Sequence, residues 1–214
     1  MTDPILLPDG TVRLLNGAHK GRAGDDRADD PVLEPLLYHA SKPAGSRFEK
    51  MPKTEIPRLN PDVFYNAYGN VSINAAYPEF QNNGHTSYLH QQQSPDVNHP
   101  TEYRVEIFAP TYMDSAARPV TDTAPETIKY GQQTTVSASG LEDKLVKVQL
   151  SYSGFHTHAV DMGQRMVELE LEVEGENVTI TGPANASVMP PGVYLLWVVA
   201  DGVPSEARWV SLQQ

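Results

Sequence analysis

The chain has 214 residues and a formal charge of −11, with 39% hydrophobic residues, 18 prolines and 15 glycines. This length suits one large or two small domains, and the proline and glycine content predicts a loop-rich β protein. The acidic balance excludes a nucleic-acid binder, which needs a basic surface, and argues against binding to an anionic membrane. A neutral or cationic small molecule stays compatible as a partner.

The chain contains no cysteine, so it forms neither disulfides nor thiolate metal sites. Its first residues, MTDPILLPDGT, have neither the basic nor the apolar region of a signal peptide, and no run reaches the roughly 18 apolar residues of a membrane span. As written, the chain is therefore expected in the cytosol. Three N-glycosylation sequons, beginning at Asn70, Asn177 and Asn185, either arise by chance or hint at a secreted ancestor.

In the first half of the chain, short apolar runs alternate with turns. Residues 4–17 place two apolar runs around a Pro-Asp-Gly turn, which predicts a β-hairpin. Residues 18–31 predict a loop, and Glu34–Tyr38 and Arg47–Met51 predict short strands. This spacing is typical of propeller blades, although many other sheets share it. Residues 59–100 show no periodicity and predict a long irregular segment, which is either a long functional loop or a damaged region.

From Glu102 onward the strand pattern is clearer. Over Val167–Glu174 apolar residues alternate with glutamates, which predicts one antiparallel strand with a buried face and a solvated face. The apolar run Val193–Ala200 predicts a central strand with Trp197 in the core. Seven or eight strands in about 110 residues favour an immunoglobulin-like β-sandwich. The remaining predicted strands are Tyr103–Phe108, Thr134–Ala138, Leu145–Tyr152, Val178–Ile180 and Ala207–Leu212.

Several phrases of the second half resemble the galactose oxidase-like early-set domain. They are HPTEYRVEIFAPTYM (99–113), FHTHAVDMGQR (155–165) and MPPGVYLLWVVADGVPSEARWV (189–210), with Arg118-Pro119 between the first two. In the first half, LLPDGTVRLLNGAHKGRAG and DPVLEPLLYHASKPAGSRFEKMPKTEIPRL resemble the last blades of the glyoxal oxidase propeller. Each phrase alone is weak, but all of them in this order are specific to the galactose oxidase/glyoxal oxidase family of copper radical oxidases.

The resemblance implies an all-β chain of two parts. Residues 1–100 would be an incomplete kelch-type propeller remnant, that is, partial β-propeller blades with an irregular insert at 60–100. Residues 101–214 would be an immunoglobulin-like early-set domain. Members of the family are secreted, and they oxidise aldehydes or primary alcohols with O2 and release hydrogen peroxide.

The resemblance also implies a site. The family holds one copper ion with two histidines and two tyrosines. One of these tyrosines is cross-linked to a cysteine and carries a radical. Imidazole suits copper, and the metal and the tyrosyl radical each take one electron. One histidine comes from a sandwich loop with the phrase Thr-His-x-x-x-x-x-Gln-Arg, which here runs from Thr157 to Arg165. His158 is therefore the copper-ligand position, and the alternative is an ordinary, partly exposed loop histidine.

The other ligands of the family do not carry over. Its Tyr-His pair follows an Ile-Pro-Arg phrase and starts a strand of the form YHSxALLLPDG. Here Ile56-Pro57-Arg58-Leu59 leads directly to Asn60-Pro61, as if that strand were cut out, and the cysteine is also absent. Because one imidazole does not make a redox copper site, we expect this chain to be an inactive oxidase fragment that binds no copper tightly. The alternative is a non-catalytic immunoglobulin-like module with a binding role, for example toward carbohydrate, or a structural role.

Other polar clusters are interpreted as ordinary surface residues, and for each a functional alternative is given in parentheses. These clusters are His156 with His158 (adventitious metal), His85, His90 and His99 with Tyr88 (a rebuilt copper site), Tyr65, Tyr68 and Tyr77 (carbohydrate stacking), and Asp25, Asp26, Asp29 and Asp30 (calcium, although EF-hand spacing is lacking).

Overall fold

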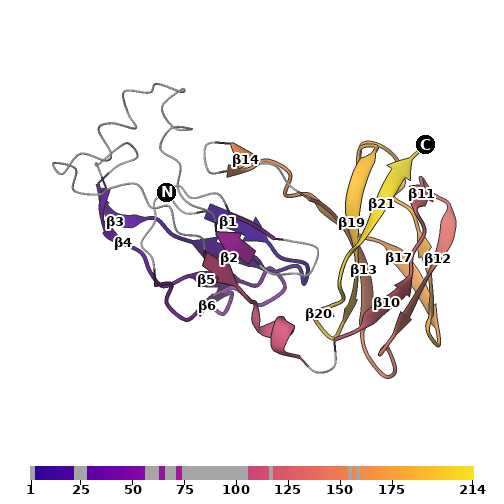
Figure 1. The fold of residues 1–214 in the computed structure, drawn as a ribbon, viewed down its shortest axis with the longest axis horizontal. Helices are drawn as coiled ribbons and strands as arrows, with labels where there is room; N and C mark the ends of the chain where they lie inside the picture. The colour runs from indigo at the N-terminus through magenta and orange to yellow at the C-terminus, as the bar shows by residue number, and fades with distance from the viewer. Residues whose placement is uncertain are drawn as a thin grey trace.

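The computed structural model shows an all-β chain in which an N-terminal sheet packs beside a two-layered sandwich (Figure 1). The structure describes residues 3–21, 28–55, 63–65, 71–73, 106–115, 118–153, 156–157 and 160–214. Among these residues, helical structure is confined to one short 3-10 turn, η1 (Thr111–Asp114), and no helix is long and apolar enough to cross a membrane. The predicted all-β fold class is confirmed.

The N-terminal sheet is antiparallel, with its four strands in the order β1-β2-β5-β6. The predicted hairpin is present, with Ile5 opposite Arg13. Asp9 closes its turn, because its Oδ1 atom accepts hydrogen bonds from the backbone N (2.9 Å) and Oγ1 (2.7 Å) of Thr11. A four-stranded sheet is the size of one propeller blade, and the propeller itself stays a prediction. The strands are β1 (Asp3–Leu6), β2 (Val12–Leu15), β5 (Leu36–Tyr38) and β6 (Phe48–Lys50).

The prediction of a loop over residues 18–31 was wrong at both of its ends. Strands β3 (Ala18–Gly21) and β4 (Ala28–Pro31) pair antiparallel there. Lys20 lies opposite Asp29 and forms an ion pair with Asp30 at 3.4 Å, and such cross-strand charge pairs favour strand pairing. The polar sequence hid this hairpin because neither strand has an apolar face.

The segment expected to be an irregular insert, residues 60–100, also contains strands. Strands β7 (Val63–Tyr65) and β8 (Val71–Ile73) pair with each other, and β8 pairs with β9 (Glu106–Phe108). The rest of the segment lies outside the described residues. Val71 and Ile73 flank Ser72, but three residues are too few for a period-two pattern to stand out.

The sandwich has an outer sheet in the order β10-β12-β18-β17 and an inner sheet in the order β11-β21-β19-β13-β16, with β20 beside β19. As predicted, the apolar run from Val193 to Ala200 is a central strand. The outer strands are β10 (Val120–Thr123), β12 (Gln133–Ser139), β18 (Asn177–Thr181) and β17 (Glu170–Glu174). The inner strands are β11 (Thr127–Lys129), β21 (Arg208–Gln213), β19 (Gly192–Ala200), β13 (Val146–Tyr152), β16 (Met166–Glu168) and β20 (Val203–Pro204).

The main core lies between these two sheets. Alternate residues of the longer strands point into it, so that β18 contributes Val178 and Ile180 and β19 contributes Leu196 and Val198. Burial of these aliphatic side chains stabilises the sandwich by about 25 cal/mol for each Å² removed from water. This core defines the predicted immunoglobulin-like sandwich.

The single strand predicted over Val167–Glu174 is instead two strands in different sheets. Strand β16 pairs with β13 in the inner sheet, and β17 pairs with β18 in the outer sheet. Leu169 lies at the crossing point and is buried, whereas Val173 is 45% exposed. The alternating pattern continues across the change of sheet, which is why it looked like one strand.

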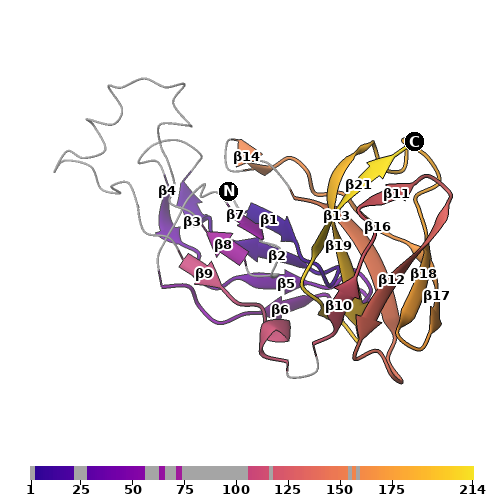
Figure 2. The ribbon, with the colours of Figure 1, turned by 45° about the vertical axis from the view of Figure 1, so that its right-hand side comes forward.

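A second apolar cluster joins the N-terminal sheet to the inner sheet. The face of β19 that points away from the main core carries Leu195, Trp197 and Val199, and these pack with Ile5, Leu7, Leu15 and Tyr112. Trp197 is fully buried, as predicted, and its Nε1 donates to Ser151 Oγ at 2.9 Å. Strand β19 is therefore covered on both faces, and Figures 1 and 2 show the N-terminal sheet on one side and the outer sheet on the other.

Candidate functional site

A β-ribbon extends from the sandwich toward the N-terminal sheet and carries the phrase that contains His158. It continues the β13–β16 pair: Tyr152 N donates to Arg165 O at 3.4 Å, and beyond this bond β14 (His156–Thr157) pairs with β15 (Val160–Asp161). Strand β15 contacts β1 and β7, so the ribbon lies over the N-terminal part of the molecule (Figure 1). A segment of the sandwich thus reaches the N-terminal sheet.

Two side chains at the end of the phrase hold the base of this ribbon. Gln164 Nε2 donates to Pro4 O of β1 at 2.9 Å. Arg165 Nη1 donates to Val188 O, in the loop before β19, at 3.1 Å. A net contribution of about 1 kcal/mol is typical of each such bond. Gln164 therefore ties the ribbon to the N-terminal sheet and Arg165 ties it to the sandwich.

His158 follows β14 and precedes β15 in sequence, but it lies outside the described residues. Of the other histidine, tyrosine and aspartate candidates, the structure describes only His156, Asp29, Asp30 and the backbone of Tyr65. His156 opposes Asp161 in the ribbon ladder, and Asp29 and Asp30 are exposed in β4. The structure therefore brings none of the predicted site residues together among those that it describes. The candidates that lie outside the described residues are His85, His90, His99, Tyr68, Tyr77, Tyr88, Asp25 and Asp26.

The donor atoms that the structure describes do not fit a copper ion. Within the described part of the chain, no three histidine, aspartate or glutamate side chains gather as metal ligands. The whole sequence lacks the cysteine that would cross-link to a tyrosine. A redox copper site needs several nitrogen, oxygen or sulfur ligands in a defined geometry. No catalytic step through copper follows from these residues.

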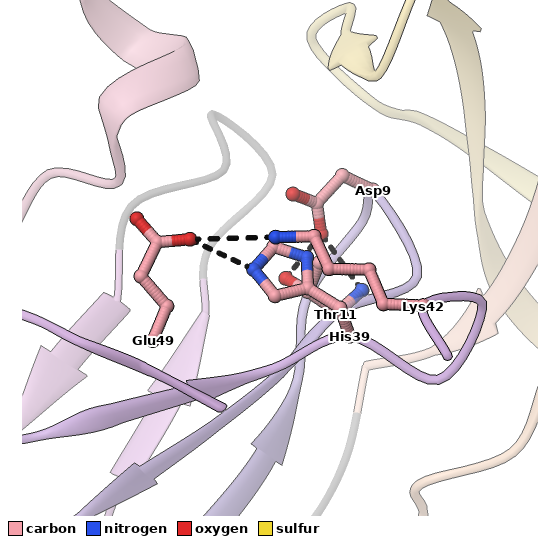
Figure 3. A network of polar contacts seen from close by, with 5 residues as sticks. All are labelled: Asp9, Thr11, His39, Lys42 and Glu49. Carbon is pink, nitrogen blue, oxygen red and sulfur yellow. Dashed lines mark hydrogen bonds and ion pairs between the residues drawn. The ribbon is translucent and has the colours of Figure 1, made fainter. Parts of the chain in front are cut away.

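The N-terminal sheet carries a polar cluster that the sequence patterns did not reveal (Figure 3). The His39 ring lies between Glu49 and the hairpin turn: its Nε2 is 3.0 Å from Glu49 Oε2, and Lys42 Nζ is 3.6 Å from the same oxygen. Burial raises the pKa of Asp9 above its ordinary value, although the hydrogen bonds from Thr11 and the nearby His39 act in the opposite direction. The Pro-Asp-Gly motif predicted that Asp9 lies in a hairpin turn, but no sequence pattern predicted that His39 lies near it.

Arg13 is a buried cation in the interface between the N-terminal sheet and the sandwich. Only 1% of it is exposed, and burial lowers the pKa of its guanidinium to about 10, while Tyr112 acts to raise it. Arg13 shares a strand face with Leu15, which belongs to the second apolar cluster. Such burial of a charge is costly, so this position is electrostatically unusual without being part of a metal site.

Family comparisons agree with this two-part structure. Residues 1–112 match the family model described as the glyoxal oxidase N-terminus, and residues 118–212 match the galactose oxidase-like early-set domain. The chain belongs to the glyoxal oxidase family. At the first residue of the second match, Arg118 ties the connecting segment to the sandwich, because its Nε donates to Pro204 O at 2.7 Å and its Nη2 to Ser205 O at 2.9 Å.

Three curated relatives carry oxidase names, and this chain spans less than half of the length of each. An aldehyde oxidase (GLOX1) of Arabidopsis thaliana is 33% identical over 99% of this chain, which covers 35% of that relative. An aldehyde oxidase (GLOX) of Vitis pseudoreticulata is 34% identical over 99% of this chain, which covers 41% of it. A galactose oxidase of Gibberella zeae is 27% identical over 98% of this chain, which covers 29% of it.

A solved structure has the same fold. It is a fungal alcohol oxidase in complex with copper, which aligns over 100% of this chain and 42% of its own chain with a TM-score of 0.78 and 19% identity. At this identity the likeness establishes the fold alone. The match of residues 118–212 to the early-set domain and the fold of this alcohol oxidase both agree with the early-set sandwich predicted from the sequence.

Proposed function

We propose that this chain is the C-terminal part of a glyoxal oxidase-like copper radical oxidase and does not catalyse the oxidation by itself. The observation that supports this most is the ribbon from Tyr152 to Arg165. It leaves the sandwich, contacts β1 and β7, and carries the Thr-His-x-x-x-x-x-Gln-Arg phrase between its strands. This is how a sandwich domain would present His158 to a site outside itself.

The missing copper ligands support the proposal that the chain does not catalyse the oxidation by itself. Arg58-Leu59 is followed directly by Asn60-Pro61, with no Tyr-His pair, and the chain has no cysteine. One histidine leaves copper without the second imidazole and without the cross-linked phenol that would carry the radical. Two-electron oxidation then has no acceptor in this chain.

The substrate class follows from the named relatives. Aldehyde oxidase, galactose oxidase and alcohol oxidase relatives point to small aldehydes and primary alcohols. The net reaction of the intact enzyme would convert an aldehyde, O2 and water into a carboxylic acid and hydrogen peroxide. With a primary alcohol, it would convert the alcohol and O2 into the aldehyde and hydrogen peroxide.

A peroxide assay tests the proposal. The purified chain is incubated with cupric ion and then with methylglyoxal or galactose in air, and peroxide is measured with a peroxidase-coupled dye. We expect no peroxide above that of a copper-free sample. Peroxide that His158→Ala abolishes and His19→Ala preserves would contradict the proposal, because His19 is an exposed histidine of β3 and controls for adventitious copper.

One observation supports a second candidate function, a non-catalytic module that binds carbohydrate. Trp209 is 56% exposed and lies opposite Leu195, on the face of the inner sheet that the N-terminal sheet covers only in part. Val193, on the same face, is 54% exposed. Exposed indole rings can stack on sugars. Retention of the chain on a polysaccharide column that Trp209→Ala abolishes would favour this function.

A further inference from the structure

Two of the three sequons fall on described residues of the sandwich, and the proposed oxidase function leaves both unexplained. They are Asn177-Val178-Thr179 and Asn185-Ala186-Ser187. Asn70 of the third lies outside the described residues. An acceptor asparagine must be accessible and must tolerate a bulky polar chain, so burial and position decide whether a sequon can function.

Asn177 meets these conditions on the outer sheet. It is exposed, it begins β18 directly after the turn at Gly175, and it lies between Glu174 of β17 and Ser137 of β12. Thr179 lies two residues further along the same strand and therefore shares its face. Val178, between them, is fully buried in the main core. The sequon thus presents both its amide and its hydroxyl on the solvent side of the sheet.

That solvent side is polar around the sequon. Across β18, Thr179 lies between Glu172 of β17 and Thr135 of β12. A glycan on this face would cover hydrated side chains and would displace no apolar contact. Figure 2 shows β17 and β18 on the side of the sandwich away from the N-terminal sheet, so a glycan there leaves the interface formed by β19 unobstructed.

Asn185 lies beyond the other end of β18, in an exposed loop. Its Oδ1 accepts hydrogen bonds from Ser187 N at 2.9 Å and from Val188 N at 3.3 Å. These bonds fix the side chain in an Asx turn and use only the amide oxygen. The nitrogen, which would bear the sugar, belongs to an exposed residue between the exposed Ala184 and Ala186.

We propose that Asn177 and Asn185 are N-glycan acceptor sites of this chain in a eukaryotic secretory pathway. The donor is a lipid-diphosphate-linked oligosaccharide, and a membrane oligosaccharyltransferase supplies the catalysis. The asparagine Nδ2 forms a bond to the anomeric carbon of the sugar, and the bond from that carbon to the diphosphate oxygen breaks. The amide proton passes to a base, and the lipid diphosphate leaves, so no oxidation or reduction occurs.

The test uses the full chain, directed to the endoplasmic reticulum of yeast by a cleavable leader, with Asn70→Gln to remove the third sequon. Total microsomal protein is treated with peptide N-glycosidase, which converts each glycosylated asparagine into aspartate, and the peptides are sequenced by mass spectrometry. We expect conversion at Asn177 and Asn185. Both peptides remaining unmodified in chain that has reached the lumen would overturn the proposal.

Matched variants separate acceptor function from folding. Thr179→Ala should remove the glycan at Asn177, whereas Thr179→Ser should keep it, because only the hydroxyl is required. Thr181→Ala is the control: it alters the next residue on the same face of β18 but lies outside the sequon. Likewise Ser187→Ala should remove the glycan at Asn185 and Ser187→Thr should keep it. Loss of a glycan in Thr181→Ala would contradict the assignment at Asn177.

Discussion

Trp197 and Trp209 lie in neighbouring strands of the inner sheet but have opposite environments. Trp197 is fully buried between the N-terminal sheet and the inner sheet, and it donates to Ser151 Oγ, whereas Trp209 is 56% exposed. Trp197→Ala should therefore lower the free energy of unfolding by about 3–5 kcal/mol, as is typical when a large core side chain is removed. Trp209→Ala should change it by less than about 0.5 kcal/mol. Urea unfolding followed by circular dichroism measures both values, and comparable losses in the two variants would contradict the assigned interface.

Asp9 gives the N-terminal sheet a pH dependence whose sign is fixed by burial. Burial raises the pKa of folded Asp9 above its ordinary value of 3.8. The folded chain therefore holds this proton more tightly, and the stability it contributes is greatest below pH 3.8 and is lost as the pH rises through the folded pKa. Asp9→Asn keeps the Oδ1 acceptor for Thr11 and removes the titration.

Relative to the wild type, Asp9→Asn should therefore gain stability as the pH rises from about 3.5 to 7. Urea midpoints at several pH values measure this difference. The exposed Asp29→Asn variant controls for the general loss of one surface carboxylate. A difference between Asp9→Asn and the wild type that stays constant, or that falls with rising pH, would show that burial does not dominate at Asp9.

Among the secondary-structure elements, the proposed function depends most on the ribbon from β13 through β14 and β15 to β16, and Gln164 anchors it to β1. Gln164→Glu keeps the size of the side chain but replaces the donor to Pro4 O by an acceptor. Loss of a bond of about 1 kcal/mol should speed amide hydrogen exchange in β14 and β15 about fivefold. Hydrogen-exchange mass spectrometry measures this change. Gln213→Glu, an exposed substitution of the same kind in β21, should leave these amides unaffected, and equal exchange in the two variants would refute the anchoring role.

At the same scale, the sequence predicted most of the longer sandwich strands with an apolar face, but it missed the short β11, in which Ile128 is fully buried. Val136, Val148 and Val178 follow period-two patterns, Leu196 lies in the apolar run, and their strands were found. Strands β3 and β4 were missed because cross-strand charges, and not an apolar face, hold them together. The division of Val167–Glu174 was missed because alternation does not record which sheet a strand joins.

The candidate site was less predictable from composition and spacing. His158 was predicted only through the family phrase, since a lone histidine carries no metal signal of its own, and this assignment stays a prediction. The anchoring bond of Gln164 joins residues 160 positions apart, and the contact of His39 with Glu49 joins the residue after β5 to β6. Such contacts depend on tertiary packing, which local patterns do not encode.

At the scale of the whole molecule, β19 holds the two parts together. One of its faces packs in the sandwich core, and the other packs against Ile5, Leu7 and Leu15 of the N-terminal sheet. This arrangement makes the N-terminal sheet a fixed support for the ribbon, since β1 also accepts the Gln164 hydrogen bond. The strands on either side of residue 158 are therefore placed against this sheet, and we propose that the chain lacks the ligands that would complete a copper site there.

Copper stoichiometry tests this central claim most directly. The purified chain is dialysed against cupric ion in the presence of a competing chelator, and bound copper is counted by mass spectrometry under native conditions. We predict substoichiometric copper, with the wild type, His158→Ala and His19→Ala variants alike. One tightly held copper ion per chain that His158→Ala removes and His19→Ala retains would contradict the account.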